Sequence, residues 1–448
     1  MEWAEPEIRP PRSGSQRAAI GAAFAATVPG LLLGVGSDHP SGYGGAAVFG
    51  LGIIGAAFLL AWAAEALQLD VSQGLALAVL ALIAVLPEYV VDFTFASKAG
   101  EDPHRYAPLA LANMTGSNRL LIGVGWTAVV LVAAWRMKRI ARARGYAGDL
   151  DTQVRLDRPH SIEIGFLAVA TAYSLTLPLK NHLTLFDCGV LVALYVGYVW
   201  RISRSPAEEP HLVGPARLLG GLPRAQRRAA VGAMLVYSAA VILTCAEPFA
   251  DALVATGREL GISTFLLVQW LAPLASEAPE LLVAILFAWR LNTNGGLGTL
   301  VSSKVNQWTL LVGTLPLVFV IAGGAGSGLP LDRLQREELF LTAAQSAFAV
   351  AILANRSIDV REAWSLFTLF AAQFVLGGVL PAGIRHWERL GVGIAYLVLA
   401  SVILLADRGR LGGLGRDAFR TPASELARGD PRAGDAPPVA GPTPGSRS

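Results

Sequence analysis

The sequence predicts an all-α protein that crosses a membrane many times. Of its 448 residues, 53% are hydrophobic and only 15% are charged, whereas soluble domains average about 25% charged residues. Apolar stretches of roughly 17–28 residues recur, each long enough to cross a hydrocarbon core of ~30 Å as a helix. About twelve spans are expected. They lie near 17–35, 44–67, 72–98, 106–135, 161–178, 183–201, 228–258, 263–290, 298–323, 337–354, 363–384 and 390–406.

The two ends of the chain differ from the rest in composition. Residues 1–16 are rich in proline and charge, and residues 411–448 are rich in glycine, proline, alanine and arginine, so both predict disordered tails. The apolar stretch 17–35 follows several arginines, as in a signal peptide. Its length and the lack of a small-x-small cleavage site favour a retained helix.

Basic residues predict the orientation of the spans. The loops 136–158 and 201–228 are rich in arginine, whereas the connections 98–107 and 323–338 have few basic residues. With twelve spans, both basic loops fall on the same side as both termini, and that side is expected to be cytoplasmic. The sequence thus predicts a multi-pass protein of the plasma or inner membrane with both termini in the cytoplasm.

An internal repeat supports this arrangement. "LPEYVVDF" at 86–93 parallels "APELLVAI" at 278–285, with a Pro-Glu pair in the middle of each span. The next span opens polar and ends apolar in both cases, as "LANMTGSNRLLIGVG" at 111–125 and "LVSSKVNQWTLLVG" at 300–313. The two units begin an odd number of spans apart, so they are expected to be inverted. Inverted repeats with interrupted midplane helices are typical of transporters.

The prolines of this repeat predict free backbone oxygens inside the membrane. Proline has no N–H and clashes with the carbonyl four residues earlier, so Pro87 is expected to free the carbonyl of Ile83. Pro279 is expected to do the same for Ala275. A free carbonyl is costly in hydrocarbon unless it lines a polar cavity or meets a ligand.

Acidic side chains lie beside both prolines. Glu88 and Glu280 follow them directly, and Asp92 and Glu277 lie about one turn away. Converging repeats would bring carbonyl oxygens and up to four carboxylates to one midplane point, which suits a hard cation such as Ca²⁺. A single proline could be a tolerated kink, and a single acid could pair or reach the interface. Matching placement in two units favours an ion site.

Other polar residues allow two interpretations. Asn113, Ser117 and Asn118 follow the acidic span and could bind the ion or mediate helix packing. Glu247 and Asp251 could line a vestibule or lie near the membrane interface. The cysteines at 188 and 245 lie in separate apolar runs and predict buried hydrophobic residues.

The repeats resemble those of the sodium/calcium exchanger family, within the calcium:cation antiporters. In that family each repeat resembles Gly-Thr-Ser-Leu-Pro-Glu followed by Gly-Asn-x-x-Gly-Ser-Asn. "LPE" at 86–88 and "NMTGSN" at 113–118 match well, and "SEAPE" at 276–280 and "SSKVNQW" at 302–308 match loosely. The resemblance covers roughly 44–384. The implied units are an extra helix at 17–35, a first five-helix repeat at 44–201, a cytoplasmic loop at 202–227, a second five-helix repeat at 228–384 and an extra helix at 390–406.

The resemblance also implies a set of ion-binding residues. Glu88 and Glu280 would be the paired Ca²⁺ carboxylates, Asn113 would be a ligand, and Ser303 would fill the equivalent place in the second repeat. Ser276 stands where the family has a threonine. The expected site comprises Glu88, Asp92, Asn113, Ser117, Asn118, Ser276, Glu277, Glu280, Ser303 and Asn306.

The chain departs from the family pattern at several positions. Residues 83–85 are Ile-Ala-Val where the family has Gly-Thr-Ser, Glu277 replaces a usual serine, and Asp92 falls on a usual hydroxyl position. Lys304 lies in a span that is expected to be uncharged. It is expected either to pair with Glu277 or Asp92 as a fixed cation, or to extend to the membrane interface.

The predicted function is secondary active cation antiport at a midplane acidic site, with Ca²⁺ exchanged for Na⁺. The alternative is a cation/proton antiporter that uses the same carboxylates. Access would alternate as spans 44–67 and 228–258 slide past the rest. The sequence predicts no enzyme, no cofactor beyond the transported Ca²⁺, Na⁺ or H⁺, and no nucleic-acid partner. The expected partners are inorganic cations and the lipid bilayer, and the expected state is a monomer.

Overall fold

The computed structural model describes residues 13–426 apart from 37–38, 71–84, 146–149, 205–211, 213, 262 and 407, and these residues are mostly helical. The helices are α1 Ser13–Val35, α2 Gly42–Leu67, α4 Leu86–Glu101, α5 Pro103–Leu120, α6 Thr127–Ala143, α7 Ser161–Ser174, α8 Leu185–Ile202, α9 Pro215–Gly220, α10 Arg224–Leu260, α11 Thr264–Trp289, α12 Thr293–Asn306, α13 Val312–Ile321, α14 Arg333–Leu353, α15 Val360–Val379, α16 Ala382–Ala406, α17 Arg408–Phe419 and α18 Ala423–Leu426.

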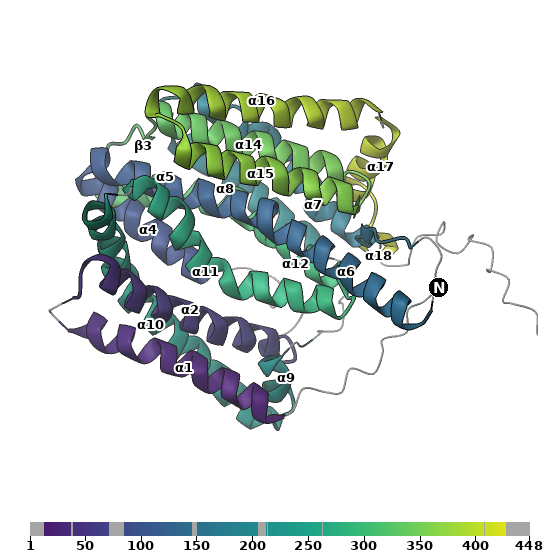
Figure 1. Cartoon of the computed structure of the whole chain (residues 1–448), viewed down its shortest axis with the longest axis horizontal. Coiled ribbons are helices and arrows are strands. Elements are labelled where there is room, and N and C mark those ends of the chain that lie inside the picture. Colours follow the sequence, from purple (N-terminus) through teal and green to yellow (C-terminus); the bar gives the residue numbers. More distant parts are fainter. Residues whose placement is uncertain are drawn as a thin grey trace, which may run out of the picture.

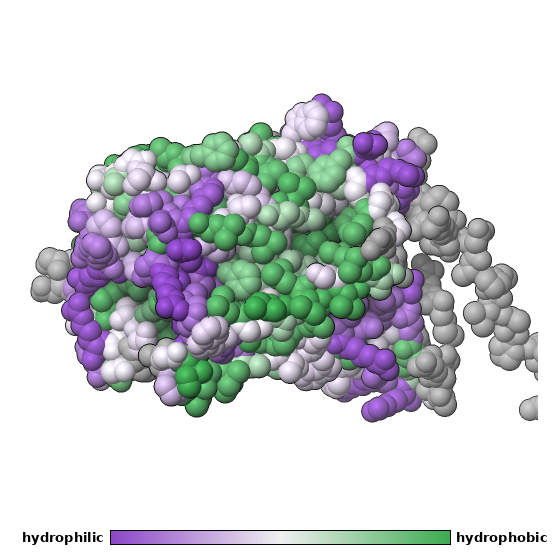
Figure 2. Space-filling model, turned by 90° about the horizontal axis from the view of Figure 1, so that it is seen from above, coloured by the Kyte–Doolittle hydropathy of each residue, from purple (hydrophilic) through white to green (hydrophobic). Residues whose placement is uncertain are grey.

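Within the described residues, ten helical segments are long and apolar enough to cross a membrane. Hydrophobic residues form a broad band across the middle of the molecule, and hydrophilic residues gather at its two ends (Figure 2). The fold is therefore an all-α polytopic membrane protein. Ten of the expected spans correspond to these segments. The span 72–98 includes residues outside the described part, followed by α4, and the span 337–354 is α14, which buries several polar side chains.

The helices pack in three groups (Figure 1). One group contains α1, α2 and α10, which pack closely on one another. A central group contains α4, α5, α11 and α12, and a third contains α14, α15 and α16. Small residues allow close contact within the first group. A Cβ atom added to Gly55 would lie 2.6 Å from the backbone oxygen of Ala23, and one added to Gly50 would lie 3.1 Å from the Phe249 ring. The central group is the one that carries the predicted acidic residues.

The second spans of the two predicted repeats share an unusual local structure. A π-helical segment, Leu121–Trp126, joins α5 to α6, and another, Gln307–Leu311, joins α12 to α13. Single π-helical turns inside longer helices are rare and often lie at functional sites. When Leu121 is aligned with Leu311, the second segment ends at the position where the first begins, so the two π-helical segments are neighbours in the repeat and not at the same place. The inverted relation of the two units stays a prediction.

Two short strand pairs tie loops together. β1 (Val154–Arg155) pairs with β4 (Ser357–Ile358), and β2 (His182–Leu183) pairs with β3 (Leu329–Pro330). In the predicted order of spans, the first two loops lie on the cytoplasmic side and the last two on the opposite side. The pairing is therefore compatible with that order, while the side that faces the cytoplasm stays a prediction.

Part of each predicted disordered tail is helical, so these two predictions are wrong at their inner edges. Helix α1 begins at Ser13, inside the tail 1–16, and α17 and α18 lie inside the tail 411–448. Helix α17 is held by packing that composition does not reveal, since Phe419 packs on Phe166 and Asp417 pairs with Arg158 at 2.9 Å. The remainder of each tail lies outside the described residues.

Candidate functional site

Four buried carboxyl groups form the centre of the site. Glu88 and Asp92 lie on α4, and Glu277 and Glu280 lie on α11. Their exposed fractions are 1%, 0%, 2% and 8%. An ionised carboxylate is rarely buried to this extent unless a cation, a proton or hydrogen-bond donors compensate it. The groups that surround these four acids therefore determine what the site can bind.

The first proline starts a helix. Pro87 lies in the first turn of α4, where its missing N–H costs no helical hydrogen bond. Glu88 consequently lies near the positive end of the helix dipole, which favours a negative charge. Ile83, whose carbonyl was expected to be free, lies outside the described residues.

The second proline lies inside a continuous helix, so the expected interruption is wrong for α11. Pro279 still cannot donate to the Ala275 carbonyl, because proline has no N–H. The helix continues because packing on both sides offsets the loss of one hydrogen bond. Helix α11 packs against α2, α5 and α12.

Glu88 and Glu277 share two polar neighbours. The Ser117 hydroxyl lies within hydrogen-bond distance of both carboxyl groups. The Gln307 amide donates to Glu88 Oε2 at 2.8 Å and to Glu277 Oε1 at 2.7 Å. A hydroxyl group has one hydrogen to donate and can accept another. Ser117 can donate to one carboxylate only, and a proton on the other carboxyl group would make the second contact a hydrogen bond as well. The arrangement is compatible with a carboxyl pair that shares one proton.

The other two acids are each held by a residue of their own repeat. Asn113 donates from Nδ2 to Asp92 Oδ1 at 2.7 Å. Ser303, at the equivalent position of the second repeat, donates to Glu280 Oε2 at 2.7 Å. Asn113 and Ser303 thus position acids of their own repeat, whereas Ser117 and Gln307 contact acids of both.

Several buried oxygen atoms of this cluster have no hydrogen-bond partner among the described residues. A buried oxygen without a protein donor can accept from a water or coordinate a cation. Carboxylate and amide oxygens are the ligands that Ca²⁺ prefers. The unpartnered atoms are Asp92 Oδ2, Asn113 Oδ1, Glu277 Oε2, Glu280 Oε1 and Gln307 Oε1.

The polar neighbours of Glu88 are shared with Glu277. Glu280 lies about one turn further along α11 and is held by Ser303. The roles of Glu88 and Glu280 as paired Ca²⁺ carboxylates, and the convergence of all four acids on one ion, stay predictions. Hydroxyl and amide groups separate the acids.

Three predicted site residues have other partners. Asn118 donates to a backbone carbonyl one turn earlier and accepts from Lys304 at 2.6 Å. Ser276 donates to backbone carbonyls of its own helix at 3.3 Å. Asn306 accepts from the Tyr89 hydroxyl at 2.6 Å. The structure therefore brings seven of the ten predicted residues to the acids and places these three beside them.

Lys304 is buried, and neither of its two expected contacts is present. Its side chain is completely inaccessible to solvent, so it does not extend to the membrane interface. Among the described residues no carboxylate lies within 4.0 Å of its ammonium, so it forms no ion pair with Glu277 or Asp92. The ammonium instead lies on Asn118 and over the Trp308 ring, 4.5 Å from its centroid.

Glu247 and Asp251 take no part in the acidic cluster. Both lie on α10 with more than half of each side chain exposed, and both pair with Lys98 of α4, at 3.1 and 2.8 Å. They form an exposed contact between two helix groups, and their place in a vestibule or near the membrane interface stays a prediction.

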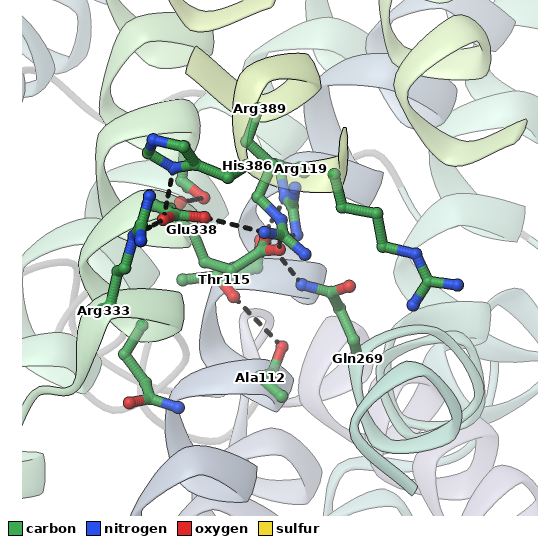
Figure 3. Close-up of polar contacts among 12 residues, drawn as sticks. Ala112, Thr115, Arg119, Gln269, Arg333, Glu338, His386 and Arg389 are labelled. Atoms are coloured by element: carbon green, nitrogen blue, oxygen red, sulfur yellow. Dashed lines mark hydrogen bonds and ion pairs between the residues drawn. The ribbon is translucent and has the colours of Figure 1, made fainter. Parts of the chain in front are cut away.

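A second buried cluster escaped the sequence analysis. Arg119 of α5 pairs with Glu338 of α14 at 2.6 Å, and Arg389 of α16 pairs with the same carboxylate at 2.9 Å (Figure 3). Gln269 of α11 also donates to Glu338, at 2.9 Å. Arg119 and Glu338 are only 1% and 4% exposed. This cluster joins α5 and α11, which form the acidic site, to the third helix group.

The neighbouring Glu337 extends this cluster toward solvent. It accepts from Arg389 at 2.7 Å and from Arg333 at 3.0 Å, and His386 Nδ1 lies 2.6 Å away. A signal for the cluster was present in the sequence, because Arg119 lies inside an apolar span where a charge is expected to be functional or paired. Its partner could not be read from the sequence.

Gln307 was also missed, although the repeat contains its signal. Alignment of the second spans through Leu121 and Leu311 places Gln307 opposite Ser117. Because Ser117 is a predicted ligand, its equivalent Gln307 is also a candidate ligand. It was not among the predicted site residues, because those followed the family pattern, which has no glutamine at this position.

The fold and the site together define a class of protein. A bundle of membrane-spanning helices surrounds buried acids and unpartnered oxygens, and such intramembrane acids are typical of ion pathways in transporters. The protein is a polytopic cation transporter.

Comparison with known proteins gives the family. The family described as sodium/calcium exchanger protein matches residues 41–203 and 231–377, which is more than half of the chain. The chain belongs to this family and is a secondary active cation antiporter. The matched regions begin after α1 and end before α16.

Two solved structures are similar to this chain. One, described as the H⁺/Ca²⁺ exchanger CAX, is 40% identical, with a TM-score of 0.82 over 91% of this chain and 98% of that chain. Native YfkE is 15% identical, with a TM-score of 0.57 over 84% of this chain and 100% of that chain, which shows a shared fold. No curated protein sequence matched the chain.

Proposed function

We propose that this antiporter exchanges Ca²⁺ for H⁺. The observation that carries the proposal is the contact of Glu88 and Glu277 with one Ser117 hydroxyl. A proton on one of the two acids makes both contacts hydrogen bonds, and a bound cation would take the place of that proton. A site that holds either a proton or a divalent cation on the same carboxylates couples the two ions directly.

The surrounding oxygens support Ca²⁺ as the second ion. Ca²⁺ binds six to eight oxygens and tolerates irregular geometry. The unpartnered carboxylate and amide oxygens of the site supply ligands of this type. In the proposed exchange, Ca²⁺ binds to Glu88 and Glu277, their shared proton leaves, and Ser117 donates to a single carboxylate. The reverse steps release Ca²⁺ when protons return.

Residues of the site also bear on whether H⁺ or Na⁺ is the coupled ion. The sequence predicted Na⁺, which binds to neutral oxygens in addition to acids. Val85 and Glu277 occupy positions where the family has hydroxyl ligands, and Lys304 adds a fixed positive charge. The similar CAX structure is described as an H⁺/Ca²⁺ exchanger. These features together favour H⁺.

The helix groups support alternating access. Helices α2 and α10 pack closely on each other, and both contact α4 or α11, which carry the acids. In the proposed cycle this pair slides against the central group and exposes the acids to one side at a time. The protein would lie in the plasma or inner membrane with both termini in the cytoplasm. It would act without a bound cofactor, as a transporter and not an enzyme.

Transport in proteoliposomes tests the proposal. Purified protein is reconstituted with ⁴⁵Ca²⁺ outside, and an imposed pH gradient, acidic inside, is compared with an imposed Na⁺ gradient at equal pH. We expect Ca²⁺ uptake with the pH gradient alone, together with alkalinisation of the lumen.

Two controls complete the experiment. An ionophore that collapses the pH gradient should abolish uptake, which separates coupled exchange from a channel. Glu88→Gln should abolish uptake under either gradient. Uptake with the Na⁺ gradient alone would overturn the assignment of H⁺ as the coupled ion.

A further inference from the structure

We propose that the Lys304 ammonium occupies a monovalent-cation position of the transport site and takes the place of a bound Na⁺. This inference rests on the proposed function, because it explains why a member of an exchanger family would need no sodium. It assigns Lys304 a role in ion specificity that goes beyond packing.

The ligands of the ammonium are those of a small cation site. Lys304 Nζ lies 2.6 Å from the side-chain oxygen of Asn118 and 3.3 Å from its backbone oxygen. Neutral carbonyl oxygens, including backbone ones, are the ligands that coordinate Na⁺ in membrane transporters. The Trp308 ring faces the ammonium from 4.5 Å, and an aromatic face also attracts a cation.

The absence of a direct ion pair distinguishes this lysine from an ordinary buried one. A buried ammonium is costly and is normally paired with a carboxylate. Among the described residues Lys304 has no carboxylate within 4.0 Å of its ammonium, and its contacts there are the two Asn118 oxygens and the Trp308 ring. The ammonium therefore occupies a position separate from the acid pair, as a second bound cation would.

The position is linked to the acid pair through α5. Asn118 directly follows Ser117, the residue that contacts both Glu88 and Glu277. A cation held by Asn118 therefore lies beside the acids without competing for their oxygens. Because Lys304 is covalently attached, its charge stays with the site throughout the cycle and is never transported.

The purely structural alternative is that Lys304 only clamps α12 to α5. The two roles differ in what happens when the side chain is shortened. Lys304→Ala removes the charge and leaves space beside the Asn118 oxygens, into which Na⁺ can bind. Lys304→Met removes the charge but fills the space with an apolar chain of similar length. A cation position predicts that only the alanine variant responds to Na⁺.

The test measures Na⁺ binding to the purified protein in detergent, independently of transport. Equilibrium binding of ²²Na⁺ and the melting temperature in NaCl or choline chloride are compared for wild type, Lys304→Ala and Lys304→Met. We expect saturable ²²Na⁺ binding to the alanine variant only. We also expect its melting temperature to rise in NaCl by about 5 °C, because a ligand that binds only the folded state stabilises it.

Transport provides the second readout. Ca²⁺ uptake by Lys304→Ala should be at least several-fold faster with Na⁺ present than with choline, while wild type and Lys304→Met should not respond. Identical salt responses of the two variants in both assays would overturn the inference. Failure of the proposed function would look different, since wild type would then take up no Ca²⁺ under a pH gradient, whereas ²²Na⁺ binding would be unaffected.

Discussion

The carboxyl groups of Glu88 and Glu277 contact the same hydroxyl group, although they lie on different helices and in different predicted repeats. The hydroxyl belongs to Ser117 of α5, and Gln307 of the π-helical segment after α12 bridges the same two acids from its equivalent position. Each predicted repeat thus contributes one acid and one neutral bridging group. A cation or proton bound between these two acids therefore contacts residues of both predicted repeats.

This arrangement predicts that Ca²⁺ transport depends on both acids of the pair and, to a smaller extent, on the hydroxyl group between them. Glu88→Gln and Glu277→Gln each remove one member of the pair, so each should reduce Ca²⁺ uptake by roughly 100-fold or more, since site affinity depends on ligand charge. Ser117→Ala keeps both acids but removes their shared group. It should reduce uptake by roughly 10-fold to 100-fold, as loss of ligand-orienting groups does at metal sites.

Uptake of ⁴⁵Ca²⁺ by reconstituted variants checks these values. Glu247→Gln is the matched control, because Glu247 is exposed, pairs with Lys98 and lies outside the acidic cluster. It should transport at nearly the wild-type rate. Near-normal uptake by Glu277→Gln would show that the pair is not the transport site.

Close packing beside Ser117 provides a second prediction. A Cβ atom added to Gly116 would lie 1.7 Å from the backbone oxygen of Gln269 in α11. Gly116→Ala must therefore push α5 away from α11 and separate Ser117 from Glu277. We expect a lower melting temperature and at least a 10-fold loss of Ca²⁺ uptake, because overpacking a tight contact costs about 1–3 kcal/mol or more.

Gly232→Ala is the control for this variant. Gly232 lies in α10, and a Cβ atom there meets nothing within 4 Å. This substitution should leave uptake unchanged and stabilise the helix slightly, since alanine favours helices more than glycine does. Equal behaviour of the two variants would contradict the role assigned to the contact of α5 with α11.

Much of this fold could be predicted from composition and spacing. Apolar run length predicts membrane helices directly, because the bilayer imposes a minimum length on every span. The Pro-Glu pairs and the polar openings of the following spans located the site, because buried charges are too costly to retain without a role.

The contacts between side chains could not be predicted in the same way. Glu277 and Glu280 are about one turn apart on α11, so sequence alone does not decide which of them faces Glu88. Likewise, the partner of Arg119 is Glu338, on a helix that contacts α5 only in the folded bundle. Helix α17 escaped prediction because its stability comes from contacts with α7 and not from its own composition.

The Arg119–Glu338 pair predicts a strong dependence of stability on a single charge. Removing one partner of a buried ion pair costs about 3–5 kcal/mol when the other charge is left uncompensated. Without Arg119, Glu338 keeps Arg389 and Gln269, so the cost is expected at or below the lower end of that range. Arg119→Met should therefore lower the melting temperature by several degrees. The double variant Arg119→Met with Glu338→Leu should lose less than the sum of the two single variants.

A double-mutant cycle on melting temperatures measures this coupling. Arg155→Met is the matched control, because Arg155 pairs with Asp151 on the surface, where both side chains are more than 60% exposed. Exposed pairs contribute about 0–1 kcal/mol, so this variant should be nearly neutral. Additive losses in the buried cycle would show that Arg119 and Glu338 are not coupled.

The contact of Asp70 with Arg227 predicts a pH-dependent stability outside the membrane-spanning helices. Asp70 follows the end of α2, and Arg227 of α10 binds its carboxylate at 2.6 and 3.1 Å. The hydrogen bonds from Arg227, assisted by Arg228, lower the pKa of Asp70 to about 2, although burial opposes this shift. A lowered pKa in the folded state means that the ionised form stabilises the fold.

The sign of the effect follows from the two pKa values. Above the unfolded pKa of about 4, Asp70 is ionised in both states and the full stabilisation is present. As the pH falls from about 4 toward 2, the unfolded chain takes up a proton first and the stabilisation is lost. The melting temperatures of wild type and Asp70→Asn should therefore differ most above pH 5 and converge as the pH falls to 3 and below, as measured in detergent. Asp151→Asn, at the exposed pair with Arg155, should differ little from wild type at any pH. A gap between wild type and Asp70→Asn that stays constant or widens in acid would show that Arg227 does not stabilise the ionised form of Asp70.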